Sequence, residues 1–232
     1  MTKLYKALAT VAKEREQVGR VIQLPGTKAA ASGSPIGHKM TEMYQFIRAQ
    51  RKDGSINTIQ FIGTHKGAGT STLLRAFAKV VSTRLEKSVL IVDADPEASQ
   101  AEHFADLSAP RPKNPNVIRR VGNSNLYLIE ARFGRDSDNV FVGLPYTQRQ
   151  LVTLRKLYDL ILIDSSPAQE SSDNVALTKN VDGVIMVLEA DKTRWQVAKS
   201  LKEKIEDQGA RILGTVLNGH QYHIPEAIYK RL

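Results

Sequence analysis

Residues 56–72 read INTIQFIGTHKGAGTST, and this stretch decides the fold expected for the chain. A short apolar run over residues 56–62 leads into a glycine-rich segment, and a helical pattern follows from about residue 70. A strand, a glycine-rich loop and a helix in this order allow backbone N–H groups and a helix N-terminus to surround phosphate oxygens. The stretch therefore predicts a phosphate-binding loop, with a glycine-rich turn that needs no ligand as the competing interpretation.

Five further runs rich in Val, Ile and Leu follow, separated by helical patterns. The expected strands cover residues 56–62, 88–93, 125–130, 158–164, 182–188 and 210–217. The expected helices between them cover residues 70–87, 145–157, 172–180 and 193–208, and residues 108–124 and 131–144 are expected to be irregular. Strands that are apolar on both faces, in β-α-β-α order, are typical of a parallel sheet covered by helices. The sequence therefore predicts an α/β fold in three layers, with a mostly parallel central sheet flanked by helices.

The front of the chain differs from this core. Residues 2–18 show the apolar spacing of an amphipathic helix, residues 25–37 have the composition of a linker, and residues 39–51 form a second expected helix. We expect an N-terminal helix and linker over residues 1–38 and an α/β domain over residues 39–232, of which residues 218–232 form a C-terminal tail.

Charge and composition narrow the possible functions. The 232 residues carry 33 Lys+Arg and 24 Asp+Glu, a net charge of +9. Residues 1–55 hold ten basic and four acidic side chains (net +6), whereas residues 56–232 hold 23 and 20 (net +3), so the excess suits an anionic surface or an acidic partner. The absence of cysteine excludes disulfides, thiolate zinc sites and cysteine nucleophiles. Neither a secretory signal nor an apolar run of membrane-spanning length is expected.

The glycine-rich loop departs from the phosphate-loop pattern G-x-x-x-x-G-K-[ST] in two places. When Gly69 and Ser71 are aligned with the last glycine and the hydroxyl, Thr70 stands at the lysine position and Thr64 at the first glycine. Lys66 or Arg75 is a candidate for the missing charge. The expected nucleotide-binding residues of the loop are Lys66, Gly67, Ala68, Gly69, Thr70, Ser71 and Thr72.

Carboxylates follow two of the expected strands. The run over residues 88–93 ends in Asp93 and is followed by Asp95, and the run over residues 158–164 ends in Asp164. The carboxyl ends of parallel strands share one sheet edge, where the glycine-rich loop also emerges. Carboxylates at this edge can hold Mg²⁺ and orient a nucleophile for phosphoryl transfer, although a single Asp is often only a turn or cap residue. We expect Asp93, Asp95 and Asp164 as catalytic residues, with Ser71, Asp93 and Asp164 at the metal.

In these motifs the sequence resembles the cytoplasmic domain of bacterial tyrosine kinases of capsule and exopolysaccharide biosynthesis. The resemblance covers most of residues 39–232 and rests on the degenerate loop, the D-x-D pair Asp93 and Asp95, and the D-x-x-P segment Asp164–Pro167. The family has a P-loop fold related to septum-site and partition ATPases. In such relatives the residue that corresponds to Asn218 lies near the adenine pocket.

The departures from this family are as informative as the matches. Its catalytic lysine is replaced by Thr70, and Glu97 stands where arginine is usual. The family's oligomerisation motif E-x-x-R-x-x-R is represented by Glu42 and Arg48, without the middle arginine. The tyrosine cluster that such kinases phosphorylate is reduced to two phosphosite candidates, Tyr222 and Tyr229.

Three functions remain open at this point. The favoured one is a kinase-like regulatory component of exopolysaccharide or capsule biosynthesis and export, with weak or lost phosphoryl transfer. It would bind ATP or ADP with Mg²⁺ if nucleotide binding is retained, and dock on a membrane-embedded copolymerase at the inner face of the cell membrane. Self-association is possible, and nucleic acid is not an expected partner. The alternatives are an active tyrosine autokinase that uses Lys66 or Arg75, and a partition-type ATPase, whose signature lysine is His65 here.

Overall fold

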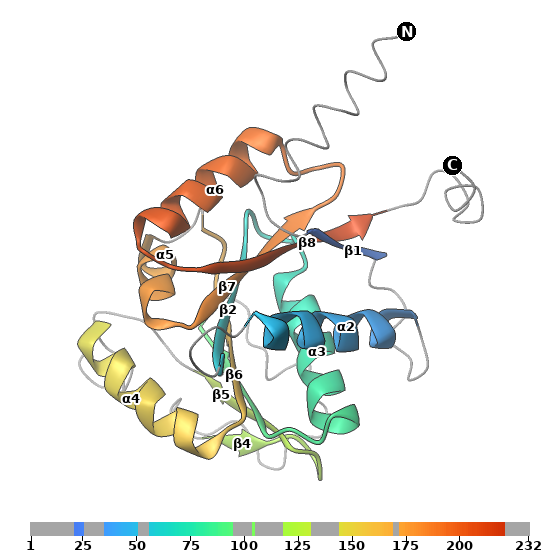
Figure 1. Ribbon diagram of the computed structural model, residues 1–232, viewed down its shortest axis with the longest axis vertical. Coiled ribbons are helices and arrows are strands. Elements are labelled where there is room, and N and C mark those ends of the chain that lie inside the picture. Colours follow the sequence, from blue (N-terminus) through green and yellow to red (C-terminus); the bar gives the residue numbers. More distant parts are fainter. Residues whose placement is uncertain are drawn as a thin grey trace, which may run out of the picture.

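A central sheet of eight strands carries helices on both faces (Figure 1). The computed structural model describes residues 21–25, 35–50, 56–94, 104, 118–130, 144–168 and 172–220. The strands are β1 (Val21–Pro25), β2 (Thr58–Gly63), β3 (Val89–Asp93), β4 (Arg119–Arg120), β5 (Leu126–Glu130), β6 (Leu160–Asp164), β7 (Gly183–Glu189) and β8 (Ile212–His220). The helices are α2 (Pro35–Ala49), α3 (Thr70–Arg84), α4 (Leu144–Leu157), α5 (Ser172–Leu177), the 3₁₀ turn η2 (Thr178–Asn180) and α6 (Trp195–Asp207).

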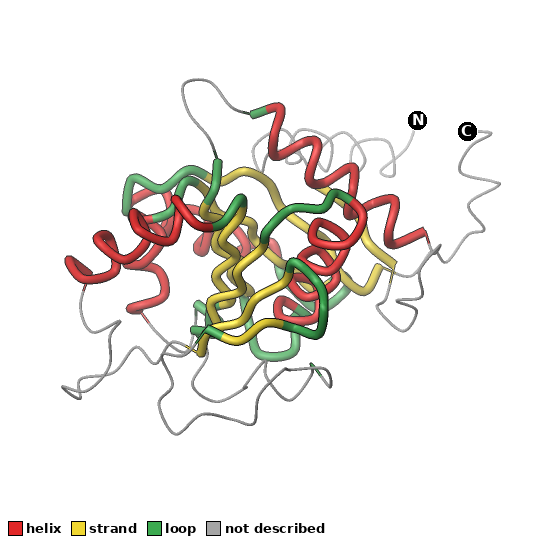
Figure 2. The backbone as a smooth tube through the Cα atoms, turned by 90° about the horizontal axis from the view of Figure 1, so that it is seen from below, coloured by secondary structure: helices red, strands yellow, loops and turns green. Residues whose placement is uncertain are grey.

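The strand order is β1-β8-β7-β2-β6-β3-β5-β4, and every pair of neighbours is parallel except β4 with β5. Alternate strand residues face opposite helix layers, as the pleat of a sheet requires. On β3, Val89 and Ile91 belong to the core beneath α2 and α3, whereas Leu90 and Val92 belong to the core that includes Leu151 of α4. A third core lies beneath α6. Figure 2 shows the strands between these helices. The three-layer, mostly parallel α/β fold predicted from the sequence is confirmed.

The six strands and four core helices expected from the sequence are present, with small shifts of their ends. Two strands were not expected: β1 pairs in parallel with β8 inside the segment interpreted as helix and linker, and β4 lies in the expected loop over residues 108–124. Helix α2 begins at Pro35, four residues before the expected start, and proline suits a first helical position because its missing N–H has no partner there.

Several expectations lie outside the described residues: the helix over residues 2–18, most of the linker, and the tail beyond residue 220. The domain boundary after residue 38 therefore stays a prediction. Within the described part of the chain, no helix combines the length and hydropathy of a membrane span.

Candidate functional site

The glycine-rich loop connects the carboxyl end of β2 to the amino end of α3, as expected. Gly67 and Gly69 have φ of 88° and 84°, the left-handed region that L side chains rarely adopt. The Ala68 N–H donates to the His65 carbonyl at 3.2 Å, and Gly69 is the N-cap of a 15-residue helix. A helix N-terminus with a tight left-handed loop before it presents backbone N–H groups and a partial positive charge, which suits an anion.

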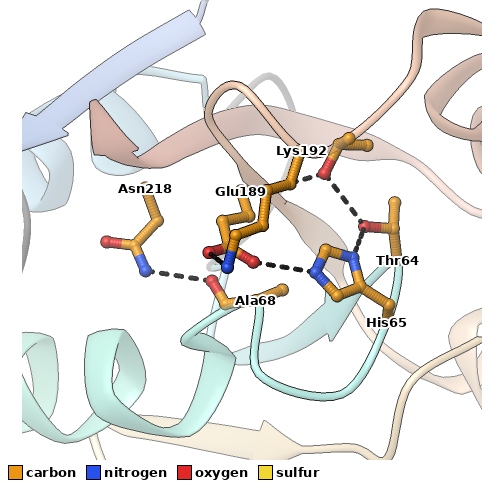
Figure 3. A network of polar contacts seen from close by, with 7 residues as sticks. Thr64, His65, Ala68, Glu189, Lys192 and Asn218 are labelled. Carbon is orange, nitrogen blue, oxygen red and sulfur yellow. Dashed lines mark hydrogen bonds and ion pairs between the residues drawn. The ribbon is translucent and has the colours of Figure 1, made fainter. Parts of the chain in front are cut away.

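Asn218, at the end of β8, holds this loop from one side. Its Nδ2 donates to the Ala68 carbonyl at 2.9 Å (Figure 3). A Cβ on Gly69 would collide with the same Nδ2, so the close approach of the amide requires glycine at residue 69. Asn218 is 6% exposed, and its Oδ1 is buried with no hydrogen-bond partner among the described residues. Asn218 therefore combines a positioning contact with a buried acceptor that has no partner among the described residues.

Thr70 occupies the lysine position at the start of α3. The residue is buried, and its Oγ1 lies so near Gly63 that a Cβ on Gly63 would clash with it. Its hydroxyl therefore packs against the end of β2 and brings no charge to the loop. Ser71 and Thr72 follow as half-buried residues of the first helical turn.

Asp93 and Asp164 lie side by side at the carboxyl edge of the sheet. They are register partners on the parallel strands β3 and β6, and their exposed fractions are 3% and 0%. Burial lowers the pKa of Arg75 on α3, and the charges of Asp164 and Asp93 oppose that shift by favouring the guanidinium. Arg75 also donates to Thr72 Oγ1 at 3.2 Å. The pairing of the two aspartates follows the expectation, and Arg75 contributes its charge to them.

Glu130 extends this row of carboxylates and was not anticipated from the sequence. It is the register partner of Asp93 on β5, and it pairs with Arg119 of β4 at 3.0 Å in a buried contact. The signal was present, since Glu130 ends an apolar strand just as Asp93 does. Glu130 lies beside Asp93 only because the strand order places β5 next to β3, and the sequence pattern did not predict that order.

His65 is fixed between two polar partners (Figure 3). Its Nε2 lies 2.8 Å from Glu189 Oε2, and its Nδ1 lies 3.0 Å from Thr64 Oγ1. The other oxygen of Glu189, Oε1, lies 2.7 Å from Lys192 Nζ. The contacts of Lys192 and then His65 lower the pKa of Glu189. This network ties the phosphate-type loop to the β7–α6 connection, and nothing in the sequence indicated it.

The remaining sequence candidates are spread over the chain. Lys66 is exposed on the turn of the loop. On α2, Glu42 lies 3.2 Å from His38 at the surface, and the Arg48 guanidinium lies 5.8 Å from the Tyr44 ring centre. Asp95, Tyr222 and Tyr229 lie outside the described residues. The roles assigned to these residues stay predictions.

The backbone of this loop suits a nucleotide phosphate, but residue 70 offers the phosphate no positive charge. The left-handed glycines, the helix N-terminus and the orphaned Asn218 oxygen suit a nucleotide, and the buried carboxylates with Ser71 have the oxygen chemistry that Mg²⁺ prefers. No charge at residue 70 meets the phosphates. Among the described residues, no group of three or more His, Cys, Asp or Glu side chains is arranged around a common metal position.

Comparison with known proteins agrees with this geometry. No protein-family model matches the chain. Curated relatives are bacterial tyrosine-protein kinases: YwqD of Bacillus subtilis (strain 168) is 24% identical over 192 residues, which cover 77% of this chain and 81% of the relative. CpsD of Streptococcus agalactiae serotype III (strain NEM316) is 27% identical over 73 residues, 32% of each chain.

Solved structures share the fold. The chimerical protein CapA2B2 has a TM-score of 0.75 at 21% identity, covering 91% of this chain and 99% of the other. The kinase domain of the Escherichia coli tyrosine kinase ETK has a TM-score of 0.66 at 15% identity, covering 90% and 96%. A plasmid partition protein from Borrelia burgdorferi has a TM-score of 0.52 at 21% identity, covering 76% and 87%. The architecture of the chain is therefore that of P-loop NTPase-like proteins.

Proposed function

We propose, from the premise that the chain resembles bacterial tyrosine-protein kinases in sequence and fold, that it is a kinase-like regulatory protein of exopolysaccharide or capsule biosynthesis and export. It has weak or lost phosphoryl transfer, and it docks on a membrane copolymerase at the inner face of the cell membrane. The observation that carries the loss is Thr70, whose hydroxyl packs on Gly63 where the motif has a lysine. The basic excess of residues 1–55 supports docking on an anionic surface.

The size of the loss follows from the chemistry of phosphoryl transfer. Catalysis of this reaction consists mostly of positioning the phosphate groups and stabilising their charge. Removal of one preorganised donor from an active site lowers the rate on the order of 10²–10³-fold. In the proposed site, Gly67, Gly69 and the α3 N-terminus would bind phosphate oxygens. Asp93, Asp164 and Ser71 would hold Mg²⁺, which would neutralise charge on the phosphates. Retained binding with little turnover is the expected result.

The test is a titration of the purified chain with ATP and Mg²⁺, followed by a phosphotyrosine assay with and without the cytoplasmic tail of the membrane partner. We expect weak binding and little phosphotyrosine, and we expect Thr70→Lys to raise both. Asp93→Ala is the matched loss-of-function control for the variant. Tight binding and strong phosphorylation in the parent chain, abolished by Asp93→Ala, would refute the regulatory interpretation.

An active autokinase is the alternative, with Lys66 or Arg75 in place of the lysine. The electrostatic link of Arg75 to Asp164 and Asp93 supports a role for Arg75 at the metal end of the site, and exposed Lys66 lies on the loop turn. Under this alternative, Lys66→Ala or Arg75→Ala abolishes phosphotyrosine formation that the parent chain shows. A partition-type ATPase is the second alternative, favoured only by the fold it shares with the Borrelia protein. It predicts DNA binding that falls steeply as salt rises.

A further inference from the structure

The loop has Thr70 in place of the motif lysine, and a lysine of another element lies close to the loop. Lys192 belongs to the connection between β7 and α6, and its Nζ lies 2.7 Å from Glu189 Oε1. The same carboxylate contacts His65 of the loop at 2.8 Å through Oε2. Figure 3 shows the Lys192 side chain extending over Glu189 toward the loop, with Ala68 and His65 below it. One carboxylate thus holds a largely exposed cation beside the loop whose motif lysine is replaced by Thr70.

The connection that carries Lys192 is held in place at several points. The Glu189 N–H donates to Thr193 Oγ1 at 3.0 Å, and the Ala190 N–H donates to the Asn218 carbonyl at 2.7 Å. Asp191 adopts a left-handed φ of 61° between them. Strained backbone conformations that the surrounding hydrogen bonds hold in place are concentrated at functional sites. Here it directly precedes Lys192, whose side chain is 69% exposed.

We infer that Lys192 supplies the cation for the terminal phosphates of a nucleoside triphosphate bound in the loop, in place of the lysine missing at residue 70. The inference rests on the proposed nucleotide binding of this loop. A triphosphate carries several negative charges against the single charge of Glu189, so it competes for the ammonium when it enters. Glu189 keeps His65 as its partner after the lysine moves. The Glu189–Lys192 ion pair is then the resting position of the cation.

If Lys192 binds the terminal phosphates, it contributes to the binding of ATP and not to that of AMP. A lysine that meets the terminal phosphates distinguishes ATP from AMP, which shares the base and sugar but ends at the first phosphate. Hydrogen bonds to charged groups contribute enough that losing one weakens binding by about ten-fold or more. We therefore expect Lys192→Ala to weaken ATP binding about ten-fold while AMP binding changes less than two-fold.

The experiment is calorimetric titration of the full chain with ATP, ADP and AMP, with and without Mg²⁺. Lys192→Arg should restore most of the ATP affinity, because the guanidinium keeps the charge. Lys199→Ala is the matched control, since Lys199 is also an exposed lysine paired with a glutamate, at 3.7 Å from Glu203 on α6. Thermal unfolding of each variant separates loss of binding from loss of structure.

The outcomes are distinguishable. Parent-like ATP binding by a folded Lys192→Ala variant overturns the inference and leaves the proposed function intact. An equal loss of ATP and AMP binding also overturns it, because it places Lys192 away from the terminal phosphates. A parent chain that binds none of the three nucleotides overturns both the inference and the proposed nucleotide site.

Discussion

Gly69→Ala tests whether Asn218 fixes the phosphate-type loop. At residue 69 the φ of 84° already disfavours any side chain, and a left-handed L-residue costs roughly 1–2 kcal/mol. The reduced entropy of the unfolded chain offsets part of this by about 0.4–1 kcal/mol. The added Cβ would also displace the Asn218 amide, which breaks its bond to the Ala68 carbonyl and leaves a buried donor without a partner at a cost of about 1–3 kcal/mol. Together these effects give an expected loss of unfolding free energy of about 1–5 kcal/mol.

Gly67→Ala is the matched control for this variant. Its φ of 88° is nearly the same, and nothing lies within 4 Å of the position its Cβ would take. It should therefore lose only the conformational part, about 1 kcal/mol. The assay is urea unfolding of the full-length variants, compared at their midpoints for equal slopes. Equal losses for the two variants would refute the role of Asn218, and so would strict additivity between Gly69→Ala and Asn218→Ala, because coupled neighbours must deviate from it.

Two further predictions concern the Glu130–Arg119 ion pair and the Asp159 carboxylate next to β6. Glu130→Ala should lower the unfolding free energy by about 3–5 kcal/mol, because it leaves the buried Arg119 guanidinium without its partner, whereas exposed Glu42→Ala should change it by less than about 0.5 kcal/mol in the same urea assay. The pKa of Asp159 lies below its ordinary 3.8, chiefly because the Ser88 N–H donates to its carboxylate. That stabilisation is present above pH 3.8 and is lost as pH falls through the lowered pKa, so unfolding midpoints at pH 6 and pH 2.5 should differ less in Asp159→Asn than in the parent.

The sequence predicted which segments form strands and helices better than it predicted which strands lie next to each other. Apolar runs identify β2, β3, β5, β6, β7 and β8 because both faces of each are buried. The five residues of β1, which include Gln23 and end at Pro25, carry no such run, and their partner β8 lies almost 200 residues away in the chain. The same limit applies to the site. The glycine-rich loop and Asp93 can be predicted from a short stretch of sequence. The contact of His65 with Glu189 joins residues 124 apart, and no local sequence pattern predicts it.

The charges around the site bear on the weak or lost phosphoryl transfer that we propose. Asp164, Asp93 and Glu130 lie in register on three neighbouring strands, and each belongs to the strand face that packs beneath α3. Arg119 pairs with Glu130, and the field of Arg75 acts on both aspartates. In the proposed site, Asp93 and Asp164 would hold Mg²⁺ close to the Arg75 guanidinium in half-buried surroundings, where like charges repel strongly. We therefore expect metal binding to require movement of Arg75. Under the proposed function, Arg75 would therefore weaken phosphoryl transfer at the metal end of the site, in addition to the replacement of the motif lysine by Thr70.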